Sequence, residues 1–520
     1  MMFFWFVFIL HLTISQEVMS PYVFSDCKHL ILPARCQCYH SGYESQLRCL
    51  KSELHSLPKL PNNMRWNALD FSFNYITSVD NYVFADIYVE KIYLNANYLR
   101  RIETTAFDQI KNLKQLYIND NQLKELHPTT LISPGASLEI FDASYNPFQY
   151  LDIGQILLNL SALKELHLVA CQLNDTSIYT LLKLIKNTTD EYNETIVGRR
   201  HYQLEILDLS YNNLTTICYH LFDGLYNLIE LRLNYNMIRL VDNNFLRSFT
   251  RIKILNLAHN SLQHVPKLSS RSLEVLNFSS NQINYISDYF ASNLHAIRLI
   301  DFDYNPNLNN TSSRAFCFLN SFSLEKLTFR SNNILSLHTF TELLCRLTNA
   351  TEKRDLLDIN NNINLKCNCT LIQFQKLLNK YNDLTCNQQG QDRYYISTLT
   401  SWLSNCQNDA CLNIQEPTKS ISCNWADAER AIYEGTCEAK LKISEKKKKN
   451  QAKLTSTIAT IVNIQRSENS TDNRNFTITE NSTINQTGKA LESNSISMKK
   501  NIYLLLIISF TVLILQKNID

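Results

Sequence analysis

The stretch "LEILDLSYNNL" at residues 204–214 decides the fold, because its pattern returns at a fixed interval. The segments "LIELRLNYNMI" (228–238) and "IKILNLAHNSL" (252–262) follow at steps of 24 residues. Each carries apolar residues at the first, fourth, sixth and eleventh positions, and Asn at the ninth. A pattern that recurs at so constant a step predicts one structural unit built many times over.

Each unit is predicted to form a short strand followed by a turn. Leu207, Asp208 and Leu209 alternate as in a β-strand with one buried face, and Asn212 ends it because its amide can bond the backbone of a turn. Read along the chain, the ninth position is held by Asn74, Asn97, Asn121, Asn146, Cys171, Asn212, Asn236, Asn260, Asn281, Asn305, Asn332 and Asn362.

This spelling, L-x-x-L-x-L-x-x-N-x-L at 20–29 residues, is the signature of a leucine-rich repeat. The fold class predicted is therefore an α/β-type solenoid, a horseshoe of about twelve repeats with a parallel β-sheet on its concave side. Cys171 replaces Asn and is expected to be a buried thiol facing the same turn. The polar segment 186–201 is expected to be a surface insertion. Phe84, Phe107 and Phe222 are expected to stack as a second apolar column behind the sheet.

The composition supports no enzyme. The 520 residues include only eight Gly, and none forms a phosphate-cradling loop. No metalloprotease or nucleophile-elbow motif is present. The net charge of +2 argues against a nucleic-acid partner. No cofactor and no metal are expected. A catalytic group of Asp142, His167 and Asp208 is the alternative, but these Asp residues are the usual spelling of the repeat.

Cysteines cluster before and after the repeats. Four of them, spaced C-x8-C-x-C-x10-C, precede "LHSLPKLP" (54–61), and "LDINNNINLKCNCTLIQF" (357–374) closes the array. A solenoid needs caps on its end repeats, and small caps need disulfides. In an oxidising compartment, disulfides are a better interpretation of this spacing than zinc.

These cysteine patterns resemble the caps of animal extracellular leucine-rich repeat proteins, the group that includes Slit, chaoptin, connectin and the Nogo receptor. The resemblance covers roughly residues 27–406. It implies the disulfide pairs Cys27–Cys38, Cys36–Cys49, Cys367–Cys386 and Cys369–Cys406. The usual Pro is missing after Asn362, and Cys411, Cys423 and Cys437 have no counterpart in the simplest cap, so their pairing stays unassigned.

One further disulfide is predicted from the repeat itself. Cys317 lies 12 residues after Asn305, and Cys345 lies 13 after Asn332. The two occupy nearly equivalent positions in consecutive repeats, which stack about 5 Å apart. That separation is within the reach of a disulfide, so we expect an inter-repeat Cys317–Cys345 bridge.

The predicted domain order is a signal peptide (1–15), an N-terminal cap (16–51), the repeats (52–365), a C-terminal cap (366–437), a disordered glycosylated stalk (438–492) and a membrane-anchor signal (493–520). The apolar run 502–515 would reach only about 21 Å as a helix. A glycosylphosphatidylinositol anchor on the outer face of the plasma membrane is therefore favoured over the alternative, a single type I transmembrane helix.

Asn-x-Ser/Thr sequons follow the signal peptide. The expected glycosylation sites include Asn174, Asn187, Asn193, Asn213, Asn277, Asn349, Asn469, Asn475, Asn481 and Asn485. Asn277 lies between the two mid-strand apolar residues Leu276 and Phe278, and a residue at that position is expected to point onto the concave side. A glycan there would cover the later repeats and direct a partner towards the earlier ones.

The expected function is recognition or adhesion at the cell surface, through an extracellular or cell-surface protein bound on the concave sheet. Contacts are expected to concentrate on Tyr93, Tyr117, His167 and Arg232, because exposed aromatic and Arg side chains dominate binding energy at interfaces. Homophilic binding is an open alternative, as is a secreted matrix protein. Tyr145, Tyr211, Tyr235 and Tyr304 precede the Asn position and are interpreted as turn residues.

Overall fold

The computed structural model describes the repeats and part of the caps. The described residues are 33, 35–41, 44–60, 65–181, 188–189, 195–196, 203–312, 314–316, 319, 323–337, 340, 356–367, 371, 385–388 and 392–395. All of them lie in the first of two units, Met1–Glu445 and Lys446–Asp520. The expected signal peptide, stalk and anchor lie outside the described residues. Within those residues, no helix is long and apolar enough to cross a membrane.

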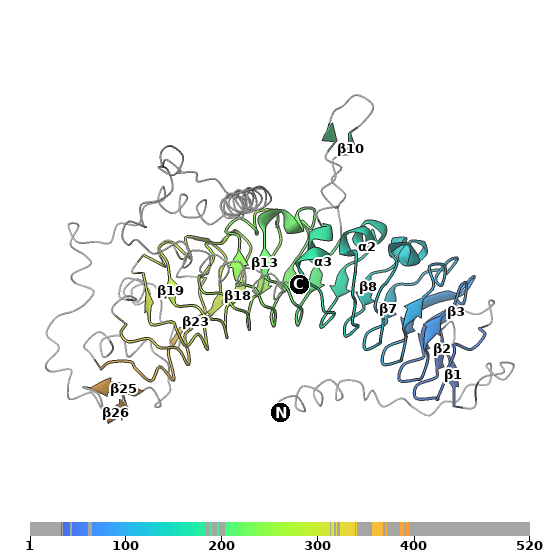
Figure 1. Cartoon of the computed structure of the whole chain (residues 1–520), viewed down its shortest axis with the longest axis horizontal. Helices are drawn as coiled ribbons and strands as arrows, with labels where there is room; N and C mark the ends of the chain where they lie inside the picture. The colour runs from blue at the N-terminus through green and yellow to red at the C-terminus, as the bar shows by residue number, and fades with distance from the viewer. Residues whose placement is uncertain are drawn as a thin grey trace, which may run out of the picture. The chain divides into compact units, whose positions relative to one another are not determined.

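One 14-stranded sheet runs through the repeats (Figure 1). The first two strands pair antiparallel and the rest run parallel, in chain order, one strand for each Asn position. The strands are β1 (Gln37–Ser41), β2 (Glu44–Arg48), β3 (Arg65–Asp70), β5 (Tyr88–Tyr93), β7 (Gln115–Tyr117), β8 (Ile140–Asp142), β9 (Glu165–His167), β12 (Ile206–Asp208), β14 (Glu230–Arg232), β16 (Ile254–Asn256), β18 (Val275–Asn277), β21 (Leu299–Asp301), β23 (Lys326–Thr328) and β24 (Leu357–Asp358).

The register keeps equivalent residues of each repeat side by side. Leu207 pairs with Leu231, and Leu231 pairs with Leu255. All three side chains are fully buried, which places one continuous leucine column behind the sheet. The predicted leucine-rich repeat solenoid is confirmed.

Shorter elements occupy the other side of each repeat. Because strands pack at about 4.8 Å and the opposite segments need more room, the stack bends with the sheet on its inner face. Figure 1 shows α2 and α3 on the outer side of the arc. The helical elements are η2 (Pro128–Leu131), η3 (Ser133–Ala136), α2 (Ile153–Asn159), α3 (Asp175–Tyr179) and η5 (Tyr219–Phe222).

Two-stranded ladders complete the described elements. Four are parallel and join neighbouring repeats, and the other two are antiparallel. The parallel pairs are β4 (Ser78–Val79) with β6 (Arg101–Ile102), β13 (Thr216–Ile217) with β15 (Leu240–Val241), β17 (Ser269–Ser270) with β20 (Asn293–Leu294), and β19 (Tyr285–Ile286) with β22 (Asn310–Thr311). The antiparallel pairs are β10 (Thr188–Thr189) with β11 (Thr195–Ile196), which belong to the predicted insertion, and β25 (Thr385–Gln388) with β26 (Asp392–Tyr395).

A column of phenylalanines fills the space behind the leucines, as expected. Phe84 and Phe107 are fully buried and stack with ring centroids 5.5 Å apart. Phe222 is also fully buried and packs against Phe245 and Phe249. Aromatic pairs of this kind contribute about 0.5–1.5 kcal/mol beyond their buried area.

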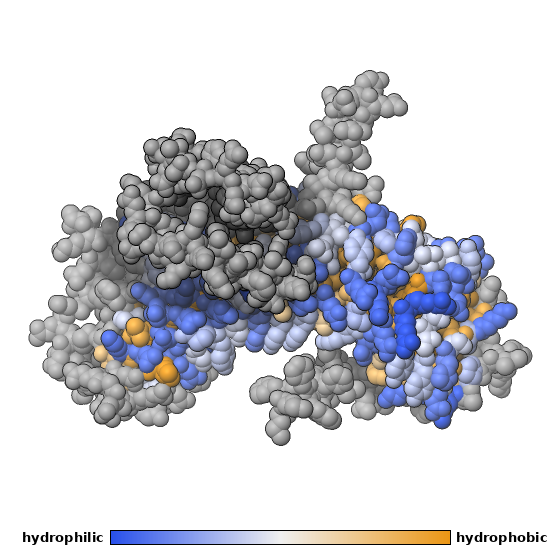
Figure 2. Space-filling view, viewed as in Figure 1, coloured by the Kyte–Doolittle hydropathy of each residue, from blue (hydrophilic) through white to orange (hydrophobic). Residues whose placement is uncertain are grey.

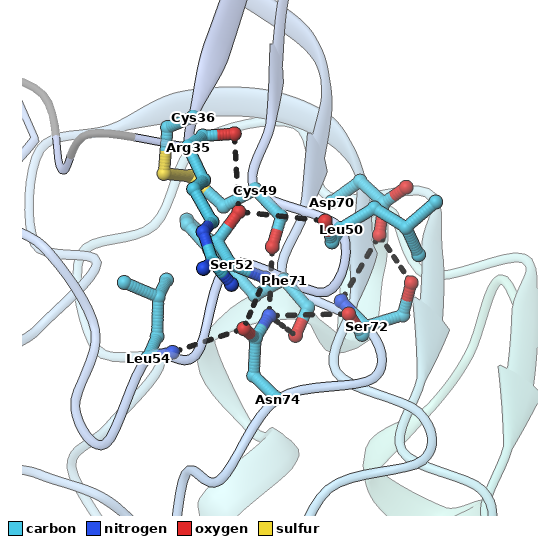
Figure 3. Close-up of a disulfide and its surroundings, with 10 residues drawn as sticks. All are labelled: Arg35, Cys36, Cys49, Leu50, Ser52, Leu54, Asp70, Phe71, Ser72 and Asn74. Carbon is cyan, nitrogen blue, oxygen red and sulfur yellow. Dashed lines mark hydrogen bonds between the residues drawn. A yellow bond between two sulfur atoms is a disulfide. The ribbon is translucent and has the colours of Figure 1, made fainter.

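The repeated Asn residues tie each turn to the next. Asn74 accepts hydrogen bonds from the backbone N–H groups of Ser52 and Leu54 at 2.9 and 3.0 Å, and donates to the carbonyls of Cys49, Phe71 and Ser72 (Figure 3). The amide of each buried Asn satisfies backbone groups that have no sheet partner, which explains its recurrence at the ninth position.

Cys171 takes the place of Asn in this series and is fully buried, as expected. Its Sγ lies 3.3 Å from the carbonyl oxygen of Ala143, the same turn that an Asn amide would bond. Burial raises the pKa of the Cys171 thiol to about 12. The side chain is therefore a structural thiol without thiolate character.

Disulfides lie at both ends of the array. Cys36 is bonded to Cys49 beside the first turn (Figure 3), and Cys367 is bonded to Cys386 of β25. Both pairs are those that the family resemblance implied. Cys38 is also disulfide-bonded. Its expected partner Cys27 lies outside the described residues, as do Cys369, Cys406, Cys317 and Cys345, so those pairings stay predictions.

Candidate binding surface

The concave sheet carries two columns of outward-facing side chains, at the first and third residues of the three-residue strands. In β7, β9 and β18 these residues are half-buried, while the residue between them is buried. Figure 2 shows one side of the arc, where the residues over β3, β7 and β8 are mostly hydrophilic with hydrophobic groups between them. On the sheet itself, the first column holds polar residues such as Lys91, Gln115 and Glu165, with Ile140 as an apolar residue between them.

Some residues at the third position of the concave strands are buried, although this position faces outward. Asp208, Thr328 and Asp358 are only 5, 4 and 5% exposed. Arginines account for two of them, because Arg232 lies 3.1 Å from Asp208 and Arg330 lies 3.8 Å from Asp358. The long side chain of a neighbouring repeat covers each carboxylate, which sequence position alone does not reveal.

Tyr93 and Tyr117 form an aromatic pair on β5 and β7. Their rings stack with centroids 4.9 Å apart and planes 5° from parallel, as the register Tyr93 to Tyr117 requires. Burial, followed by the charge of Asp70, raises the pKa of Tyr93. Burial, followed by Tyr93 and Asp142, raises the pKa of Tyr117 to about 12. Both phenols are therefore neutral hydrogen-bonding groups at physiological pH.

His167 and Arg232 lie two strands apart, each beside a carboxylate of its own strand. His167 Nε2 is 3.4 Å from Glu165, and Arg232 Nε is 2.7 Å from Glu230. Burial lowers the pKa of Arg232, but its hydrogen bonds to Glu230 and Asp208 outweigh this and raise it above the ordinary value. Because Arg232 is already held by two carboxylates, a partner must displace them to use its charge.

The three residues of the alternative catalytic group are brought together only as paired positions on neighbouring strands. Asp142 pairs with His167, and His167 pairs with Asp208, on neighbouring strands. The contact that His167 makes is with Glu165, while Asp208 accepts from Ser210 and Arg232. These contacts are explained by packing within the repeats. No group of His, Cys, Asp or Glu among the described residues could hold a metal ion.

A ladder of alternating charge borders the sheet, at the residue before the first concave column. Its members are Glu90, Lys114, Glu139, Lys164, Glu205, Ile229, Lys253, Glu274, Arg298 and Glu325, so that one apolar residue interrupts the alternation. Ion pairs join Lys114 to Glu90 at 3.0 Å and Arg298 to Glu325 at 2.7 Å. The hydrogen bond to Glu90 raises the pKa of Lys114. This ladder was not predicted from the sequence, although the same position compared from repeat to repeat shows the alternating charges.

A second aromatic stack lies where turn residues were expected. Tyr211, Tyr235 and His259 stack with centroid separations of 4.1 and 3.9 Å. All three have left-handed backbones, with φ of 58, 56 and 53°. A bulky side chain is uncommon in that conformation, so the turn alone does not explain their recurrence. Stacking on the ring of the next repeat explains why these three rings recur. His259 belongs to the stack but was not identified from the sequence.

Three predicted glycosylation sites fall on described residues with accessible side chains. Asn174 caps α3, Asn213 is exposed beside Asn212, and Asn277 is half-buried on the concave face. The remaining sequons of that set lie outside the described residues. They are Asn187, Asn193, Asn349, Asn469, Asn475, Asn481 and Asn485.

A recess of about 530 Å³ opens away from the sheet, where one repeat is shorter. Asn260 and Asn281 are 21 residues apart instead of 24, so fewer residues fill the outer side. Arg247, Phe249 and Arg271 contribute to its lining.

Comparison with known proteins identifies the repeats. Residues 87–148 and 202–262 match the leucine rich repeat family model. Human lumican is 27% identical over 260 residues, covering 48% of this chain and 68% of lumican. Fibromodulin from Gallus gallus is 28% identical over 293 residues, covering 55% and 68%. A chain in the octameric complex of Latrophilin 3, Unc5D and FLRT2 is 19% identical, with coverage of 64% and 92% and a TM-score of 0.46.

The relatives found are extracellular or cell-surface leucine-rich repeat proteins, and they are binding or structural proteins rather than enzymes. Their shared repeat is the one that Asn74 and its equivalents build here. The repeated asparagines and the parallel sheet agree with the match of residues 87–148 and 202–262 to the family model, so the repeats of this chain are leucine-rich repeats.

Proposed function

We propose that this chain is an extracellular recognition protein that binds a partner protein on the early strands of its concave sheet. The observation that carries the proposal is the Tyr93–Tyr117 stack, because a sheet face open to water has no packing need for two parallel rings. Stacked Tyr side chains on a rigid sheet offer large contact area at low entropic cost. The extracellular relatives support the same class of function.

The surroundings of the pair favour a basic side chain on the partner. Asp70 and Asp142 lie close enough to raise the Tyr pKa values. Arg48 lies 3.9 Å from Asp70, whereas none of the described basic residues lies within ion-pair distance of Asp142. A Lys or Arg inserted between Tyr117 and Asp142 would gain both a cation–π contact and an ion pair.

The proposal is tested with a library of purified extracellular domains, screened against the secreted 16–440 fragment. Replacing Tyr93 and Tyr117 together by Ala should weaken binding to a selected partner by more than about 2 kcal/mol. The matched control replaces Tyr75 and Tyr98, which also stack, at 5.9 Å, but are 46% exposed and follow the Asn positions. Equal affinity of wild-type protein and the Tyr93/Tyr117 variant would move the site off this sheet.

We propose that the protein lies on the outer face of the plasma membrane, held by a glycosylphosphatidylinositol anchor that replaces the end of a C-terminal signal at residues 493–520. Phosphatidylinositol-specific phospholipase C should then release it from cells. Mature protein that still contains peptides from 504–515 would favour a transmembrane helix. Lumican and fibromodulin are equally compatible with a second candidate, a secreted matrix protein. That candidate predicts full-length protein in the medium without phospholipase.

A further inference from the structure

An apolar patch interrupts the polar concave sheet in its later repeats. Ile254, Val275 and Leu299 pair in register as the first residues of β16, β18 and β21. All three are half-buried on the concave side. In other repeats, the same column holds Lys91, Gln115, Ile140, Glu165, Ile206, Glu230 and Lys326, so apolar residues there stand singly between polar ones.

The charges that border this patch already neutralise one another. Glu274 lies 3.0 Å from Lys253 and 3.4 Å from Arg298, and Arg298 also pairs with Glu325. The hydrogen bond from Lys253 lowers the pKa of Glu274. Few unpaired charges are therefore available here to a protein partner. The three aliphatic side chains would remain exposed to solvent unless another group covers them.

Asn277 lies within the patch and is the acceptor residue of an N-x-S sequon. It shares β18 with Val275, and the two side chains lie on the same face, about 7 Å apart along the strand. Its Oδ1 accepts a hydrogen bond from the backbone N–H of Ser279 at 2.8 Å. No described residue accepts a hydrogen bond from its Nδ2. The neighbouring Asn281 differs, because its Nδ2 donates to three backbone carbonyls inside the turn.

We propose that Asn277 carries an N-linked glycan that lies over Ile254, Val275 and Leu299 and closes this part of the sheet to protein partners. Transfer forms a bond between C1 of the sugar and Nδ2 of Asn277. The C1–O bond to a lipid-linked pyrophosphate donor breaks, Nδ2 loses one proton, and the lipid pyrophosphate leaves. The Oδ1 bond to Ser279 is untouched, so the fold accommodates the modification. The three strands span only about 10 Å, a width that the first sugars can cover.

The inference bears on the proposed function, because it confines partners to the earlier strands. Its test uses no partner, so the two can fail separately. The full chain is secreted from animal cells as wild type, Asn277→Gln, Ser279→Ala and Ser279→Thr. Peptide N-glycosidase should convert Asn277 to Asp in wild type and in Ser279→Thr, but leave no such product in Ser279→Ala. Recovery of unmodified Asn277 from wild-type protein would overturn the proposal.

Covering of the patch is measured by carbene footprinting of Ile254, Val275 and Leu299. Labelling should rise several-fold in Asn277→Gln. Asn256→Gln is the matched control, since Asn256 makes the same turn bond, to Ala258 at 3.1 Å, but begins no sequon. Should Asn277→Gln fail to be secreted, trimming folded wild-type protein to a single sugar replaces it. Labelling that does not change on loss or trimming of the glycan would show that the glycan points away from the patch.

Discussion

The backbone N–H of Cys171 donates to the side-chain oxygen of Asn212 at 3.0 Å, although 41 residues separate the two. The same oxygen accepts from Leu173, and the amide nitrogen of Asn212 donates to Leu168 at 2.8 Å. The insertion between the two repeats therefore leaves the chain of Asn hydrogen bonds unbroken. The turn that contains Cys171 and the turn that contains Asn212 are therefore joined through the side chain of Asn212.

Replacing Asn212 by Ala should lower the free energy of unfolding by about 3 kcal/mol or more, because several buried backbone groups lose their partners. Urea denaturation of the secreted protein measures the change. The control is Cys171→Asn, which restores the usual residue of the repeat and should shift the midpoint little. A midpoint unchanged by Asn212→Ala would contradict this account of the turn.

Asp301 and Asp303 should respond in opposite directions to replacement by Asn. Burial, opposed by the hydrogen bond from Asp303 N–H, raises the pKa of Asp301. A raised carboxyl pKa contributes stability below the unfolded value, which is lost as pH rises through the folded value. Asp301→Asn should therefore stabilise the protein at pH 7, because Asn has no charge to bury. The side-chain oxygen of Asn can still accept the hydrogen bond from the backbone N–H of Asp303.

Asp303 is the contrasting case, since its carboxylate is 2% exposed and accepts from Arg330 at 2.7 Å. Asp303→Asn should destabilise by about 1–3 kcal/mol, as it weakens a charged hydrogen bond. Thermal melts of the two variants at pH 5 and pH 7 separate the effects. Destabilisation of both by the same amount would refute the assignment of opposite roles.

His259 should make the protein less stable in mild acid. Burial lowers its pKa below the ordinary 6.5. The unfolded chain therefore binds a proton at this residue more readily than the folded chain does. The contribution of His259 to stability is fully present above about pH 6.5 and is lost as the pH falls through the folded-state pKa. An NMR titration, assigned with His259→Asn, should report a pKa under 6.5. A value above it would mean that the stack with Tyr235 does not bury the ring.

Non-reducing peptide maps should recover Cys36–Cys49 and Cys367–Cys386 from folded protein. Replacing Cys36 by Ser should cost about 2–5 kcal/mol and reduce secretion, because the first turn loses its covalent tie. A free thiol at any of these four positions would contradict the cap structure.

Asn159 should remain unglycosylated although it begins the sequon Asn-Leu-Ser. Its Nδ2 donates to the carbonyl of Pro128 at 2.8 Å, at the end of α2. A sugar on that nitrogen would replace one of its two hydrogens and would have to fit beside the Pro128 carbonyl. Glycopeptide mapping should find Asn174 and Asn213 modified but Asn159 bare, and a glycan on Asn159 would show that this end of α2 opens.

The sequence predicted those features that depend on periodicity alone. Leu207, Asn212 and Phe222 each recur at a fixed position, so their burial follows from stacking identical units. Interactions that depend on side-chain length could not be predicted in this way. Arg232 covers Asp208 from the next strand, and His259 extends a stack begun by Tyr211, because the rotamers of neighbouring repeats bring these groups together.

The alternating ladder from Glu90 to Glu325 has a consequence for how the array can change in length. Loss of the single repeat that holds Lys114 would place Glu90 beside Glu139, and like charges would face each other. Loss of two adjacent repeats would again place residues of opposite charge beside each other. Ancestral duplications and deletions of an even number of repeats should therefore be tolerated best. Next to Ile229, a single repeat could be gained or lost, because this residue carries no charge.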